Sequence, residues 1–150
     1  MTTKCIVLER SDGGITIRHP APAARLAGEP EDDFLERIRT SSRRQRDAKA
    51  FTVIEEAEVP TDLTFRDAWT FEDKRFGVDM PKALEVQKDR LRRARVPLLE
   101  ALDLQFMRAL EAGEGTQAIV AEKARLRDVT KHPDLESAKT PDELKAVWPL

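Results

Sequence analysis

The fold of the first half of the chain is decided by residues 5–18, which read CIVLERSDGGITIR. Two runs in this stretch, residues 5–8 and residues 15–18, are rich in β-branched side chains, and the second alternates apolar with polar side chains. Between them, residues 12–14 form an Asp-Gly-Gly step that tolerates a positive φ. Two such runs around an Asp-Gly step predict a β-hairpin.

A helix and a third strand are expected after the hairpin. The helix begins near Pro30, since the acidic residues 31–33 suit the positive end of a helix dipole. Asp33 and Arg37 lie one turn apart and are expected to form an ion pair. The apolar face of this helix and its basic far end are formed by Phe34, Leu35 and Ile38, and by Arg43, Arg44 and Arg46. Residues 51–54 predict the third strand, and the order β-β-α-β indicates an α+β module.

Residues 57–78 admit two interpretations. They hold four aromatic side chains, Phe65, Trp69, Phe71 and Phe76. One interpretation places short strands at residues 68–71 and 76–78. The other is an irregular connector whose aromatic rings pack on the first module. In either case, we assign residues 1–78 to a small α+β module and residues 79–150 to a second, helical region.

The second region is expected to begin with a long helix. Apolar side chains recur through residues 84–109 at steps of three, four and seven, which is the period of a helix. Pro97 falls inside this pattern, so a kink or a break is expected near residues 93–96. The stripe consists of Leu84, Leu91, Ala94, Leu98, Leu102, Phe106 and Ala109.

An antiparallel helical hairpin is the predicted arrangement of this region. Glycines in residues 113–115 end the long helix, and a second apolar-striped helix is expected over residues 116–129. The His-Pro step at residues 132–133 is expected to break the chain. Residues 140–143 read TPDE, an N-cap, a first-turn proline and a capping-box glutamate, which predict a short final helix through Val147.

The composition argues against an active site. The chain has 150 residues with 26 basic and 28 acidic side chains, but only two His, one Cys and six Gly. We expect Cys5 to be a buried, unreactive thiol, and His19 and His132 to be loop residues. The acidic runs at residues 31–33 and 55–58 are interpreted as a helix start and a strand end. We therefore predict no catalytic residues, no cofactor and no metal, and the single cysteine is typical of a reducing cytosol.

Two basic clusters are the strongest candidates for ligand binding. Both lack interleaved aromatic residues for base stacking, and basic helix faces are commonly solvated or paired with acidic neighbours, so nucleic-acid binding is the weaker interpretation. No apolar run is long enough to span a bilayer, and no membrane partner is expected. The clusters are Arg37, Arg39, Arg43, Arg44, Arg46 and Lys49, and Lys88, Arg90, Arg92, Arg93 and Arg95.

The long apolar stripe has two interpretations, an internal seam of the hairpin or an interface with a partner or a second copy. Both can hold, since several leucines lie off the narrow stripe. The candidates for the seam and its cover are Leu84, Leu91, Leu98, Leu102, Phe106 and Trp148. The candidate partner-binding residues are Arg92 and Arg95 at the rim, with Leu99, Leu104, Leu110 and Trp148.

The C-terminal half resembles the helical region of tail-fibre assembly and tail-assembly-chaperone proteins of tailed phages and prophages. The matching motifs are RLRRAR at residues 90–95, LRDVT at residues 126–130 and TPDELKAVWP at residues 140–149. LERSDGG at residues 8–14 and FRDAW at residues 65–69 are similar to small tail-module proteins of proteobacterial phages.

The resemblance implies a non-enzymatic protein that binds a tail fibre or another tail protein, as an assembly chaperone or a minor virion component. It would act in the host cytoplasm, with incorporation into the virion tail left open. Two alternatives remain, a phage-encoded inhibitor of a host defence factor and a nucleic-acid-binding accessory protein.

Overall fold

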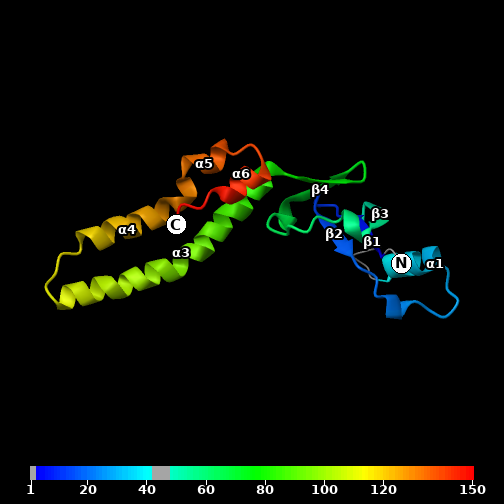
Figure 1. The fold of residues 1–150 in the computed structure, drawn as a ribbon, viewed down its shortest axis with the longest axis horizontal. Helices are drawn as coiled ribbons and strands as arrows, with labels where there is room; N and C mark the ends of the chain where they lie inside the picture. Colours follow the sequence, from blue (N-terminus) through cyan, green and yellow to red (C-terminus); the bar gives the residue numbers. More distant parts are fainter. Residues whose placement is uncertain (1–2, 42–47) are drawn as a thin grey trace. The chain divides into compact units, whose positions relative to one another are not determined.

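The computed structural model describes residues 3–41 and 48–150. The chain divides into two compact units, Met1–Asp79 and Met80–Leu150, called here the N-terminal unit and the helical unit. The N-terminal unit combines antiparallel strands with a helix, and the second unit is helical, so the predicted α+β class is confirmed (Figure 1). None of the helices in the described ranges is both long enough and apolar enough to cross a membrane.

A three-stranded antiparallel sheet organises the N-terminal unit. Strands β1 (Lys4–Glu9), β2 (Ile15–Arg18) and β3 (Ala50–Glu55) lie in the order β2-β1-β3. The hairpin and the third strand are therefore confirmed. The central strand β1 reads as an unbroken apolar run because both of its faces are covered, and its residues from Cys5 to Leu8 are at most 3% exposed.

The predicted helix is α1 (Glu31–Thr40), and it covers one face of this sheet. Its apolar side chains Phe34, Leu35 and Ile38 form one buried cluster with Ile6 and Leu8 of β1. This arrangement follows from the strand period of two, which places Ile6 and Leu8 on the same face. The three basic residues predicted at the far end of the helix, Arg43, Arg44 and Arg46, lie outside the described residues.

The ion pair expected within α1 is replaced by another one. Arg37 does not bond Asp33 but holds Glu29, which precedes the helix, through two hydrogen bonds of 2.7 and 2.8 Å. The Arg37 guanidinium also donates to the carbonyl of Ala24 at 2.8 Å. Arg37 thus holds the loop before the helix against the helix surface. Helical periodicity does not predict this contact, because Ala24 and Glu29 lie outside the helix.

The contact between Arg37 and Glu29 is expected to lower the pKa of the Glu29 carboxyl and to make stability depend on pH. The Arg37 guanidinium, helped by the Leu26 N–H, lowers the pKa of Glu29 from 4.5 to about 2. A pKa lowered on folding stabilises the folded state above pH 4.5, and that stabilisation is lost as the pH falls toward 2. A carboxyl titration followed by NMR should give this low pKa. In Arg37→Gln it should return to the ordinary range, and an unchanged pKa there would contradict the assignment.

The interpretation with two strands is confirmed for residues 68–78. Strands β4 (Trp69–Glu72) and β5 (Arg75–Val78) form a hairpin, whose turn is made by Asp73 and Lys74 at φ values of 50° and 61°. The Phe76 ring meets those of Trp69 and Phe71 edge-on, with centroids 5.5 and 5.0 Å apart.

Phe71 joins the buried cluster on the sheet face opposite α1, which contains Cys5, Val7 and Ile54. Short 3-10 helices complete the unit: η1 (Pro22–Ala24), η2 (Glu56–Glu58) and η3 (Arg66–Ala68).

The helical unit is built on α3 (Met80–Glu111), a single helix of 32 residues. The break considered at Pro97 is absent, because the helix continues through this residue. Figure 1 shows the ribbon bending about midway along α3, as expected where proline removes a backbone donor and crowds the preceding turn.

A tight glycine turn reverses the chain after α3. Gly113 has a φ of 70°, the Glu114 N–H donates to the Ala109 carbonyl at 2.8 Å, and the Gly113 N–H donates to the Leu110 carbonyl at 3.1 Å. This pair of bonds is a Schellman motif, which requires a left-handed residue at the Gly113 position. Helix α4 (Gln117–Asp128) then runs back along α3, so the helical hairpin is confirmed (Figure 1).

Three short elements complete the helical unit. The final helix α6 (Pro141–Ala146) is capped as predicted, since the Thr140 hydroxyl accepts from the Glu143 N–H at 3.2 Å. The break predicted at the His-Pro step is confirmed, because His132 leaves the helical conformation, with a φ of −58° and a ψ of 129°. The 3-10 helix η4 (Val129–Lys131) lies before His132, and helix α5 (Pro133–Ser137) begins directly after it. Pro133 is tolerated at the start of α5 because a residue in the first helical turn needs no backbone donor.

Candidate functional site

The cysteine and the two histidines, which are residue types that commonly carry catalysis, lie far apart in the sequence, and each is buried or contacts a neighbouring group. Cys5 is fully buried in β1, and its burial, helped by nearby carboxylates, raises the pKa of its thiol. His19 lies 3.2 Å from a carboxylate oxygen of Glu56, and the His132 ring accepts the Asp134 N–H at 3.4 Å. Across the described ranges, no group of three or more His, Cys, Asp or Glu residues is arranged to hold a metal ion.

Most of the cationic side chains in the described part of the two basic clusters have partners within the chain. In the first, Arg37 holds Glu29 and Arg39 is paired with Glu36. In the second, Arg92 is paired with Asp89, and Lys88 lies 3.5 Å from Glu136. These contacts match the interpretation of basic helix faces paired with acidic neighbours.

The seam between α3 and α4 occupies the predicted stripe only in part. Leu91 and Ala109 of α3 are buried together with Leu126 of α4 and Val129 of η4. Leu84, Leu102 and Phe106 are half-buried, and Lys123 of α4 reaches across to pair with Asp103 and to lie over the Phe106 ring at 5.4 Å. Leu98 was predicted to be part of the seam and is 41% exposed, so this assignment is wrong. Helical periodicity gives the direction of a side chain but not how far the facing helix covers it.

A second apolar face lies on the C-terminal half of α3. We define the α3 outer face as Val96, Leu104, Met107 and Leu110, whose side chains are 49–54% exposed. Val96 and Met107 are eleven residues apart, which is close to three helical turns, and Leu110 is one turn further. Leu104 and Leu110 are two of the predicted partner-binding leucines, and the third, Leu99, is half-buried at the margin of this face.

The two arginines predicted at the rim have different surroundings. Arg92 is exposed and paired with Asp89. Arg95 points to the end of α4, where its guanidinium donates to the carbonyls of Leu126 and Arg127 at 3.4 and 2.6 Å. Because the last carbonyls of a helix have no intrahelical donor, this contact stabilises the helix end. Arg95 therefore connects α3 to the end of α4 within the hairpin.

Residues 147–148 are attached to α3 by a buried polar contact that helical periodicity does not predict. Gln87 is fully buried, its amide donates to the Val147 carbonyl at 2.8 Å, and its oxygen accepts from Arg90 at 2.6 Å. The Arg90 guanidinium in turn lies 5.3 Å from the Trp148 ring centre. Trp148 therefore lies against Arg90 while remaining 44% exposed. The available signal was that Gln87 falls on the apolar stripe, between Leu84 and Leu91.

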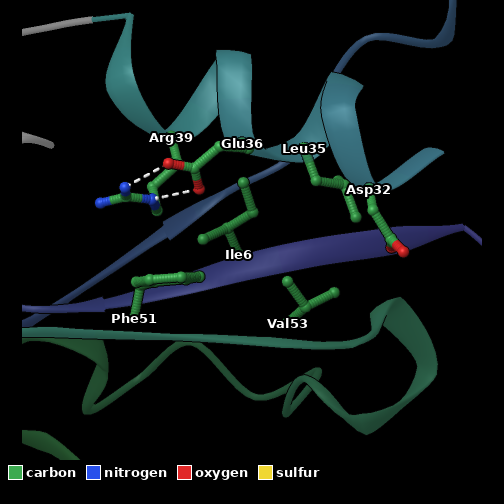
Figure 2. Close-up of a pocket in the computed structure, with 7 residues that line it drawn as sticks. All are labelled: Ile6, Asp32, Leu35, Glu36, Arg39, Phe51 and Val53. Atoms are coloured by element: carbon green, nitrogen blue, oxygen red, sulfur yellow. Dashed lines mark hydrogen bonds and ion pairs between the residues drawn. The ribbon is translucent and has the colours of Figure 1, made fainter. Parts of the chain in front are cut away.

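The N-terminal unit carries a second candidate, a shallow hollow of about 170 Å³ between α1 and β3. Figure 2 shows Phe51 and Val53 pointing from β3 toward α1, with Ile6 and Leu35 above them on the side of the helix. Arg39, paired with Glu36, lies at the Phe51 end, and Asp32 lies at the Val53 end (Figure 2). The hollow thus has an apolar floor, with the Arg39–Glu36 ion pair at one end and the Asp32 carboxylate at the other. Neither a cysteine nor a histidine is among the residues that line it.

Comparison with known proteins finds no family model, no curated protein and no solved structure that matches the chain.

Proposed function

We propose that this chain is a non-enzymatic binding protein that contacts a phage tail fibre or another tail protein through the α3 outer face. It acts during assembly, as a chaperone or as a minor component of the virion tail. The observation that carries the proposal is the row of four large apolar side chains on α3 that the helical unit itself leaves about half exposed.

Burial of this row would supply a useful part of a binding free energy. Covering the exposed half of one such side chain contributes on the order of 1 kcal/mol, and the four side chains are aligned so that one partner surface can cover them together. The hairpin seam and the Gly113 turn hold the row in place before binding, which limits the entropy lost on association. The seam is formed by buried residues on the other side of α3.

The class of partner comes from the sequence motifs. The resemblance to tail-fibre assembly proteins includes residues 90–95 of α3 and the chain end at residues 140–149. In the helical unit these segments lie together, because Gln87 and Arg90 of α3 contact Val147 and Trp148. The motifs therefore belong to one packed element, which supports their use as a single signature.

Co-expression with the product of a neighbouring tail-fibre gene tests the proposal. The wild-type chain should co-purify with the fibre protein or raise its soluble yield. Leu104→Lys should weaken the complex by roughly tenfold or more, because it places a charge in the centre of the apolar row. Affinity is measured by isothermal titration calorimetry.

Leu63→Lys is the matched control. Leu63 lies in the N-terminal unit and is 58% exposed, compared with 52% for Leu104, so the same charge is introduced at a similarly exposed leucine. Circular dichroism of both variants checks that the fold is kept. The absence of any complex with tail proteins, or a complex unaffected by Leu104→Lys, would contradict the proposal.

A further inference from the structure

Strand β3 has one edge that faces no other strand of its sheet. The strand order β2-β1-β3 places it at the border, where it pairs only with β1. The Glu56 N–H donates to the Thr3 carbonyl at 2.8 Å. This bond shows which residues of β3 direct their backbone N–H and C=O groups toward β1. Because bonding alternates along an antiparallel pair, Thr52 and Ile54 turn their backbone groups toward β1, and Phe51 and Val53 turn theirs away from it.

The free edge is short and well defined. Within residues 3–41 and 48–150, no hydrogen bond reaches the N–H or C=O groups of Phe51 or Val53. The next outward N–H, that of Glu55, already donates to the Glu58 carboxylate at 3.1 Å. Two residues therefore present four unpaired backbone groups, which is a template for one further strand.

The side chains beside this edge are exposed and apolar. Phe51 is 46% exposed and Val53 is 37% exposed, and both form part of the floor of the hollow below α1 (Figure 2). An added strand would therefore pair with the edge and cover these two side chains at the same time.

We propose that the added strand is β3 of a second copy of this chain, paired antiparallel so that Phe51 of each copy lies opposite Val53 of the other. In this register each copy uses both outward N–H groups and both outward C=O groups. A shift by two residues would place Glu55, whose N–H is occupied, opposite Phe51. The facing pairs are aromatic with β-branched, a favourable combination across strands.

Charge favours the same antiparallel arrangement. The strand is preceded by the exposed Lys49 and ends in Glu55, followed by Glu56. A two-fold axis brings the basic start of one strand to the acidic end of the other.

The helices leave room for this pairing. Because α1 packs on Ile6 and Leu8 of β1, the two copies of α1 lie above strands that are three strand spacings apart, or roughly 14 Å. Packed helices need about 8–10 Å between their axes. The remaining space between the helices lies above the two copies of Phe51 and Val53. The result is a six-stranded sheet in the order β2-β1-β3-β3-β1-β2.

Sedimentation velocity on the full chain over a wide concentration range tests the proposal. The wild type should shift from monomer to dimer as concentration rises. Val53→Lys should weaken the dimer by roughly tenfold or more, since a charged residue on an edge strand opposes pairing. Val120→Lys is the matched control, because Val120 lies on α4 and is 51% exposed, and it should leave the dimer unchanged.

Amide hydrogen exchange measured by NMR gives a second, independent readout. Exchange at Phe51 and Val53 should slow by roughly tenfold or more as the dimer forms, because their N–H groups become bonded. Exchange at Thr52 and Ile54, which face β1, should be slow at all concentrations. A chain that stays monomeric, or a dimer that is weakened by Val120→Lys and keeps fast exchange at Phe51 and Val53, would overturn the proposal.

Discussion

Leu91→Ala is expected to remove about 2–5 kcal/mol from the free energy of unfolding of the helical unit. The Leu91 side chain is 0% exposed on the seam-facing side of α3. Its truncation loses burial and leaves a cavity that the rigid hairpin closes only in part. Such a loss is a large share of the roughly 5–15 kcal/mol that stabilises a typical domain. Urea unfolding followed by the helical circular-dichroism signal measures it.

Leu104→Ala is the control for this experiment. It makes the same change on the same helix, but Leu104 is 52% exposed on the α3 outer face. The expected change is within about 0.5 kcal/mol, as for most surface substitutions. If the two variants were equally destabilised, Leu91 would not be a seam residue, and the arrangement of α3 against α4 would have to be revised.

Pro97→Ala is expected to stabilise the helical unit by up to about 3 kcal/mol, the difference between proline and alanine inside a helix. Pro97 is exposed and lies within the continuous helix α3, so alanine restores a backbone donor without removing a buried side chain. The measurement is the thermal or urea midpoint of the full chain. Glu100→Ala, at an exposed site one turn further along, controls for surface charge and should change little.

The opposite result would also be informative about the bend in α3. If Pro97→Ala destabilised the unit, straightening the helix would have to cost seam packing on one side of the bend. Leu91 lies before Pro97 and Ala109 after it, and both are buried. The two arms of α3 would then depend on the bend to reach the elements that cover them.

The elements of the fold were largely predictable because they depend on local patterns. The hairpin at residues 5–18 and the capped helix α6 follow from turn and capping residues close together in sequence. What could not be predicted are contacts between distant residues. The Arg37 pair with Glu29 displaced the expected pair with Asp33 because the loop before α1 folds back on the helix.

The candidate surfaces were predictable to a smaller extent. Periodicity separated Leu104 and Leu110 from the stripe, and the structure leaves both half exposed. It also placed Leu98 in the seam, where the facing elements do not cover it. The free edge of β3 could not be found from the sequence. The residues of β3 predict a strand, but they do not show which strands pair with it or that it lies at the border of the sheet.

The buried Gln87 amide has a consequence for the order of folding during synthesis. It joins two positions 60 residues apart in the chain. This contact forms only after Val147 has been synthesised, so the amide is hydrogen-bonded to water while α3 and α4 are being made. Burial of Gln87 is therefore a late step in the folding of the helical unit, later than the local turns and caps that set its helices.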